Sequence, residues 1–265
     1  AIAFYFQTKN KTYKQLLMVT LAILILATFF AYARGAWVAL IMGAIAYWLL
    51  RRQILVATYC VAMVLAIVSV FYLKANDRYL VFAHDYETTI FHEDFQEHLV
   101  ATIKLKDVSS AERFNRWIGG IRMVKDYWAT GSGPNTFFPL YKQYTVPAFK
   151  TWVSRNEERS TVHNYFLLTI IEQGIIGFIL LMFLLGYMFY LAQRLYKIIE
   201  NRFWKTTIAV VTVILAMVLT VNLLSDLIEA DKIGSMFYLC LAVLAIAEIR
   251  HRKVSNSTPD IHGIS

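Results

Sequence analysis

The chain has 265 residues, of which 58% are hydrophobic and 17% are charged, with 11 Gly, 4 Pro and 2 Cys. So large an apolar fraction excludes an ordinary soluble domain and a disordered chain, and two cysteines are too few for a disulfide scaffold. The net charge of +8 would suggest nucleic-acid binding in a soluble protein, but in a membrane protein it must first be compared with the topology.

Six uncharged apolar runs predict an all-α polytopic membrane protein with about six transmembrane helices. None of the runs alternates with the period of two that a strand needs, and an open sheet would leave backbone groups unpaired in lipid. The second and sixth runs are short for a hydrocarbon core of about 30 Å, so we expect them to borrow flanking residues or to lie in thinned bilayer. The runs are residues 16–33, 35–50, 54–73, about 165–192, 206–225 and 233–247.

The distribution of Lys and Arg predicts the orientation of these helices. Most positive charges of the short connections lie on one side: Lys9, Lys11, Lys14, Arg51, Arg52, Arg194, Lys197, Arg202, Lys205, Arg250, Arg252 and Lys253. The opposite short connections carry only Arg34 and Lys232. By the positive-inside rule the first side is cytoplasmic, so residues 74–162 form one long extracytoplasmic loop.

The predicted organisation has four parts. Residues 1–73 hold the first three transmembrane helices, residues 74–162 the loop or lid, residues 163–253 the last three helices, and residues 254–265 a polar, disordered cytoplasmic tail. Residues 1–6 are apolar and precede the cytoplasmic lysines. We therefore expect them to be the tail of an earlier span in a longer protein.

The long loop contains a predicted amphipathic helix. Apolar residues recur at steps of three and four between Arg113 and Trp128, and the breaker Gly131-Ser-Gly-Pro134 follows. We expect this helix to lie on the outer leaflet or against the bundle, as part of a binding site or as a structural lid. Arg113 lies at the border of the apolar face and is predicted to point toward the membrane surface, whereas Arg116 is predicted to point toward solvent.

Arg34 interrupts a long apolar stretch at the turn between the first two predicted helices. A charge there is costly unless it reaches water or a partner. Two interpretations stay open: the side chain snorkels to water at a helix end, or its guanidinium binds a phosphate near the membrane surface. Gly35 would let the chain pass close to such a group.

His163 lies at the outer end of the fourth predicted helix. With Ser160 or Thr161 as the N-cap, it would occupy the first helical turn, where the helix dipole lowers its pKa and favours neutral imidazole. Neutral imidazole can act as a general base, although a histidine bonded to the backbone at the interface is the plainer alternative. Glu172 lies deeper in the same helix, where we expect it to be paired, either orienting a substrate or locking helices together.

The sequence favours neither a metal site nor nucleic-acid binding. His84, His92 and His98 lie in the loop among acidic residues, but no pair has the spacing of a metal-binding motif. Positive and negative side chains nearly balance in this loop, so it is no general polyanion surface. A Gly-x-Ser-x-Gly hydrolase elbow is missing from the sequence. We expect no metal and no other cofactor.

Several short motifs, taken in order, resemble a known family. They are Ala33-Arg-Gly-Ala36, Glu112-Arg-Phe-Asn-Arg-Trp117, Gly131-Ser-Gly-Pro-Asn-Thr-Phe137, His163-Asn-Tyr165 and Glu172-Gln-Gly-Ile-Ile-Gly177. Together they resemble the O-antigen ligase and O-antigen polymerase superfamily of integral membrane glycosyltransferases, over about residues 16–191. Members of that superfamily have about a dozen spans, so the six predicted helices correspond to the C-terminal half.

The resemblance implies a metal-independent glycosyltransferase that moves a glycan from undecaprenyl pyrophosphate to an acceptor hydroxyl. Its active site would face the periplasm from the bacterial inner membrane. At the matching positions, Arg34 and Arg113 would bind the pyrophosphate and His163 would activate the acceptor. Fixed cations can offset the charge on the departing pyrophosphate, and attack opposite it would invert the anomeric configuration. The candidate supporting residues are Arg116, Asn164 and Glu172.

Ligation of O-antigen to the lipid A core is the leading interpretation, with the lipid-linked glycan and membrane lipids as partners. An O-antigen polymerase or a protein O-oligosaccharyltransferase would use the same donor and residues with another glycan or a protein as acceptor. A different class is a non-catalytic membrane transporter or a structural subunit. Transporters typically place paired ionisable groups or broken helices at the midplane, and no predicted helix does so clearly.

Overall fold

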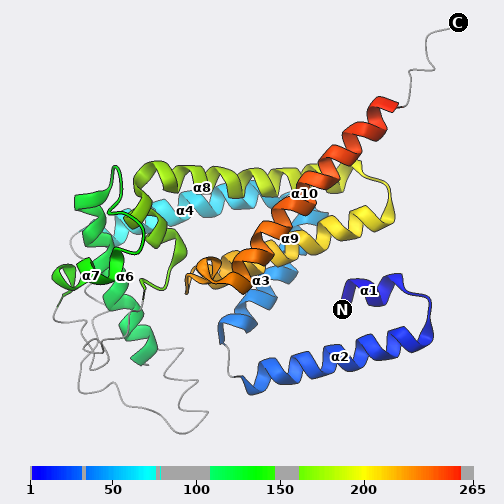
Figure 1. The fold of residues 1–265 in the computed structure, drawn as a ribbon, viewed down its shortest axis with the longest axis horizontal. Helices are drawn as coiled ribbons and strands as arrows, with labels where there is room; N and C mark the ends of the chain where they lie inside the picture. Colours follow the sequence, from blue (N-terminus) through cyan, green and yellow to red (C-terminus); the bar gives the residue numbers. More distant parts are fainter. Residues whose placement is uncertain (1, 32–33, 76–77, 79–107, 147–160, 258–265) are drawn as a thin grey trace, which may run out of the picture. The chain divides into compact units, whose positions relative to one another are not determined.

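The computed structural model describes residues 2–31, 34–75, 78, 108–146 and 161–257, and every regular element in these ranges is helical. The all-α prediction is therefore confirmed. Figure 1 shows the elements along the chain. They are α1 (Ile2–Gln7), α2 (Lys11–Phe30), α3 (Arg34–Arg51), α4 (Leu55–Lys74), α6 (Val108–Tyr127), α7 (Phe137–Tyr141), η2 (Lys142–Tyr144), α8 (Tyr165–Ile198), α9 (Arg202–Asn222), η5 (Leu227–Glu229) and α10 (Asp231–Ser257).

Among the described residues, five helices are long and apolar enough to cross a membrane, which confirms a multi-pass membrane protein. These spans are Lys11–Phe30, Leu55–Leu73, Tyr165–Ile198, Arg202–Asn222 and Asp231–Lys253. The second predicted run forms a shorter apolar helix, Gly35–Arg51. The sixth run borrows flanking residues, one of the two expected alternatives, because α10 extends into polar residues at both ends. No residue of α2 is buried in the protein, as expected of a helix whose apolar side chains meet lipid.

The C-terminal ends of α9 and α10 differ from the predicted boundaries. Helix α9 ends at Asn222 rather than Ser225, because the buried Asn222 side chain accepts the N–H of Ile228 at 3.0 Å and turns the chain into η5. Helix α10 continues to Ser257, so residues 254–257, predicted to be disordered, are helical. The rest of the predicted tail lies outside the described residues.

Asparagine N-caps begin three of the spanning helices. Asn10 accepts the N–H of Thr12 at 2.9 Å before α2, and Asn201 accepts that of Phe203 at 3.0 Å before α9. Asn164 does the same before α8. A side-chain acceptor at this position satisfies an N–H that has no partner within the helix, which fixes where each helix starts.

The chain divides into two compact units. The first comprises Ala1–Tyr59, Leu185–Val221 and Ala230–Ser265, and the second comprises Cys60–Leu184 and Asn222–Glu229. In the first unit α3 packs on α9 at Gly43, where a Cβ would lie 2.9 Å from Cγ of Met217. Close helix packing through a small residue is the usual means of association in membranes, where no hydrophobic force drives it.

The second unit holds every predicted site residue except Arg34. Helix α6 confirms the predicted amphipathic helix, and its apolar face packs on protein. Gly120 of α6 allows this approach, because a Cβ there would lie 2.9 Å from Cδ1 of Ile171 in α8. The buried cluster consists of Met123, Phe137, Tyr141, Val162, Leu168 and Ile171, with Trp117, Val124 and Tyr127 of α6 packed against it.

Helix α8 is broken at Gly174, whose backbone has φ 69° and ψ −171°. The hydropathy of the sequence did not indicate this break. The loop after α6 docks on the backbone exposed at the break through three hydrogen bonds. These bonds run from Ser132 N to Ile171 O (2.8 Å), from Gly133 N to Glu172 O (3.1 Å) and from Ile175 N to Trp128 O (2.8 Å).

Two glycines make this docking possible. Gly131 has φ 77°, and a Cβ on it would overlap the carbonyl oxygen of Glu172. A Cβ on Gly174 would overlap the carbonyl oxygen of Ala129. Only glycine permits both the left-handed backbone and the contact between two main chains. The Gly131–Pro134 segment thus does more than end a helix, because it joins α6 to α8.

The substitution Gly131→Ala tests this joint. We expect it to destabilise the protein by at least about 3 kcal/mol, since it combines a strained φ with an overlap against backbone. For a chain of this size that corresponds to a fall in Tm of roughly 6–12 °C, measured by thermal unfolding in detergent. Gly119→Ala is the matched control, because its Cβ would lie 3.6 Å from the nearest atom. Equal Tm values for the two variants would refute the assigned role.

Candidate active site

His163 lies in a turn just before α8, not inside the helix. Its backbone is left-handed, with φ 54°, and its N–H donates to Oγ1 of Thr161 at 3.3 Å. Asn164 is the N-cap, since its Oδ1 accepts the N–H of Leu167 at 3.0 Å. The prediction of Ser160 or Thr161 as N-cap, with His163 in the first turn, is wrong. The Asn164 amide reaches the third N–H of the helix and so starts it two residues after His163.

The segment after α9 holds this turn in place. Nδ2 of Asn164 donates to the carbonyl of Leu223 at 3.1 Å, and the N–H of Tyr165 donates to that of Ser225 at 3.0 Å. Asn164, a predicted supporting residue, thus uses both ends of its amide on backbone. It fixes the position of the neighbouring His163.

Arg116 is buried, with 6% of its surface exposed, so the prediction that it points toward solvent is wrong. Its Nε donates to Oε1 of Glu112 at 3.0 Å, and Nη1 donates to the carbonyl of Thr161 at 3.0 Å. Its guanidinium also lies 5.9 Å from the ring centre of Tyr141, within the range of a cation–π contact. Arg116 therefore ties α6 to the residues that precede His163.

Burial and nearby charges shift the pKa of His163. Burial is the main cause that lowers this pKa from the usual 6.5, and the positive charges of Arg116 and Arg113 lower it further. The carboxylates of Asp226 and Glu112 act in the opposite direction. The lowered pKa favours neutral imidazole at pH 7.

In the structure Arg113 and Arg116 lie close enough to His163 for their positive charges to act on its imidazole. Arg113 is half-buried on α6 and contributes to the lowered pKa of His163. Arg34 opens α3, but its side chain lies outside the described part of the protein, as do His84, His92 and His98. The placement of Arg34 at the pyrophosphate therefore stays a prediction.

Glu172 is paired, as predicted, and its partners are backbone groups. Its Oε1 accepts the N–H groups of Thr136 at 3.1 Å and Phe137 at 3.3 Å, at the start of α7. The side chain of Thr136 does not cap this helix, so the carboxylate of α8 does so instead. The cap fixes α7 on α8. It is a second connection between the N-terminal part of α8 and the loop after α6, besides the backbone bonds at Gly174.

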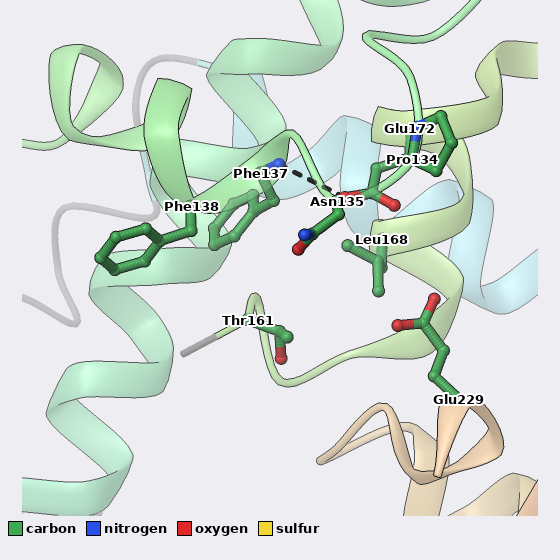
Figure 2. Close-up of a pocket in the computed structure, with 8 residues that line it drawn as sticks. All are labelled: Pro134, Asn135, Phe137, Phe138, Thr161, Leu168, Glu172 and Glu229. Carbon is green, nitrogen blue, oxygen red and sulfur yellow. Dashed lines mark hydrogen bonds between the residues drawn. The ribbon is translucent and has the colours of Figure 1, made fainter. Parts of the chain in front are cut away.

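A cavity of about 240 Å³ opens beside Thr161, two residues before His163. Figure 2 shows the carboxylate of Glu229 and the amide of Asn135 directed into it from different sides. Sequence reasoning selected neither residue. The described residues that line it are Pro134, Asn135, Phe137, Phe138, Thr161, Leu168, Glu172 and Glu229.

Glu112, Asp226 and Glu229 are also site residues that the sequence reasoning missed. Glu112 had a local signal, since it stands four residues before Arg116 and can pair with it on a helix. Asp226 and Glu229 had none beyond their position in the short connection between α9 and α10. Partial burial raises the pKa of Glu229, and the negative charges of Glu172 and Asp226 raise it further, which shows how closely these carboxylates are grouped.

Comparison with known proteins identifies one family. A family model described as O-antigen ligase (Wzy_C) matches residues 19–182, well over half of the chain. The match includes α6, the loop on the α8 break and His163. No curated protein and no solved structure matches this chain.

Arg116→Ala tests the buried ion pair. We expect a loss of about 3–5 kcal/mol, because Glu112 would remain buried without its cation. The double variant Glu112→Leu/Arg116→Met is the control, since it removes both charges and should recover most of the stability. Both are measured by thermal unfolding in detergent. If Arg116→Ala alone melted like the unsubstituted protein, the ion pair would not hold α6 in place.

Proposed function

Because the chain belongs to the O-antigen ligase family, whose members transfer lipid-linked glycans within the membrane, we propose that it joins a glycan from undecaprenyl pyrophosphate to an acceptor hydroxyl. The preferred acceptor is the lipid A core, at the periplasmic face of the bacterial inner membrane. The observation that carries this proposal is the family match together with the position of His163, two residues after the Thr161 carbonyl that Arg116 binds at 3.0 Å. Burial and the charge of Arg116 also lower the pKa of His163.

His163 acts as the general base in this proposal. The imidazole takes the proton of the acceptor hydroxyl while the hydroxyl oxygen forms a bond with the anomeric carbon of the donor sugar. The bond between that carbon and the pyrophosphate oxygen breaks, and its electron pair leaves with undecaprenyl pyrophosphate. Attack opposite the leaving group inverts the anomeric configuration.

The arginines stabilise the charge that develops on the leaving group. Arg113 lies close enough to His163 to lower its pKa, which supports a role for its guanidinium in binding a pyrophosphate next to the base. Arg34 is assigned the second contact by its motif position. Two permanent cations can offset the departing charge without a divalent metal ion. Asp226 favours the imidazolium that forms on proton transfer, because its carboxylate raises the pKa of His163.

His163→Asn is the decisive substitution. Asparagine accepts the left-handed backbone at this position but provides no base near neutral pH, so we expect transfer to fall about 10²–10⁴-fold with little loss of stability. Glycan transfer is measured with the purified protein and its lipid-linked donor. His251→Asn in α10 is the matched control and should retain activity.

The products in cells identify the acceptor. Under ligation, cells that carry only His163→Asn accumulate uncapped lipid A core and long lipid-linked chains. Chains of a single repeat would indicate a polymerase, and loss of glycan from protein Ser or Thr would indicate a protein O-oligosaccharyltransferase. If His163→Asn left the glycan products unchanged both in the purified assay and in cells, catalysis by His163 would be ruled out. A transporter or a structural subunit would then be favoured.

The pH dependence of kcat/KM tests the charges on His163. Because the pKa of His163 is lowered and the base must be neutral, activity should rise with pH below 6.5 and be constant above about pH 7. Asp226→Asn removes a charge that raises this pKa, so the rise of kcat/KM with pH (the acid limb of the profile) should move to lower pH. Arg113→Gln should move the limb to higher pH. Shifts in the reverse directions would contradict the assignment of this limb to His163.

A further inference from the structure

The cavity beside Thr161 has the size of a site for one small polar unit. Its volume of about 240 Å³ is below the roughly 300–1,000 Å³ of pockets for drug-sized ligands. It lies in the second unit, where Thr161 both lines it and accepts the backbone N–H of His163. The cavity therefore borders the turn that carries the proposed base.

The described lining of the cavity is acidic and does not suit phosphate. Among the described residues that line it, two are the carboxylates Glu172 and Glu229, and none is a Lys or Arg. A pyrophosphate would be repelled from this wall and attracted to the arginines near His163. The cavity and the arginine cluster thus suit two different parts of one substrate, an uncharged part and an anionic part.

The remaining groups of the lining suit a sugar. Glu229 offers carboxylate oxygens that accept hydrogen bonds, Asn135 offers an amide that both donates and accepts, and Thr161 offers a hydroxyl. Phe137, Phe138 and Leu168 form an apolar wall for the C–H groups of the ring. Asn135 has φ 58°, a conformation that asparagine tolerates well, and the docked loop that holds it is fixed on α8.

We propose that this cavity binds one sugar unit of the glycan substrates, with Glu229 and Asn135 bonding to its hydroxyls. The proposal rests on the proposed transfer reaction and adds the subsite that positions a sugar next to His163. The unit comes either from the donor glycan or from the acceptor. Both sources present the same ring of hydroxyls to these residues, and kinetics distinguishes them.

Binding is measured directly by saturation-transfer NMR on the purified full chain in nanodiscs. The probes are millimolar D-glucose, D-galactose and N-acetyl-D-glucosamine, with inorganic pyrophosphate as a competitor. Glu229→Ala and Asn135→Gly should each reduce the sugar signals about tenfold, because each removes hydrogen bonds to the ligand. Glycine keeps the left-handed backbone at position 135. Glu200→Ala, which removes an exposed carboxylate of the first unit between α8 and α9, should leave the signals unchanged.

Transfer kinetics on the same variants identify the source of the sugar. A KM raised about tenfold for the lipid-linked donor, with kcat retained, assigns the cavity to the donor glycan. The same change for the acceptor assigns it to the acceptor. Unchanged sugar signals in both variants, or displacement of the sugars by pyrophosphate, would overturn the proposal.

These outcomes separate the subsite from the reaction. Normal transfer by both variants with unchanged binding would eliminate the sugar subsite and leave the proposed function intact. Sugar binding that depends on Glu229 and Asn135 in a protein without transferase activity would support the subsite and defeat the proposed function. A variant that fails to fold does not prevent the test, because the two substitutions lie on separate segments and each is informative alone.

Discussion

The second unit depends on the contact between two main chains at the break in α8. Gly174 interrupts the helix and frees backbone groups there, and the loop from Gly131 to Gly133 bonds to the carbonyls of Ile171 and Glu172. An unpaired backbone group costs several kcal/mol in a membrane, so the break and the loop need one another. This joint also places Glu172 at the start of α7 and Asn135 at the cavity.

Charges of both signs act on His163. Arg116 and Arg113 of α6 lower the pKa of its imidazole, whereas Glu112 of α6 and Asp226, after α9, raise it. The described lining of the cavity has a different character, with the carboxylates of Glu172 and Glu229 beside an apolar wall. Under the proposed function, the anionic pyrophosphate of a lipid-linked glycan would be attracted to the arginines, and its hydroxyl-rich sugars would suit the cavity.

Hydropathy predicted the helices because apolar runs of this length have few alternatives in lipid. Motif order selected Arg113 and His163 as candidates, and their roles stay predictions. The burial of Arg116 was missed because the helical pattern treats every charge as exposed, whereas Glu112 and the carbonyl of Thr161 provide partners for it inside the protein. Asp226 and Glu229 were read only as charges in a short connection. Their approach to residues some sixty positions earlier depends on tertiary contacts that carry no periodic signal.

The left-handed backbone at position 163 limits which amino acids can replace histidine there. A φ of 54° is readily adopted by glycine and by asparagine, aspartate and histidine, whereas β-branched and bulky residues are outliers there. Among the tolerated types only histidine combines an accessible lone pair with a reference pKa near neutrality. Local geometry and acid–base chemistry thus select the same amino acid independently. A lineage that exchanged this histidine for a glutamate or a cysteine would also have to rebuild the turn.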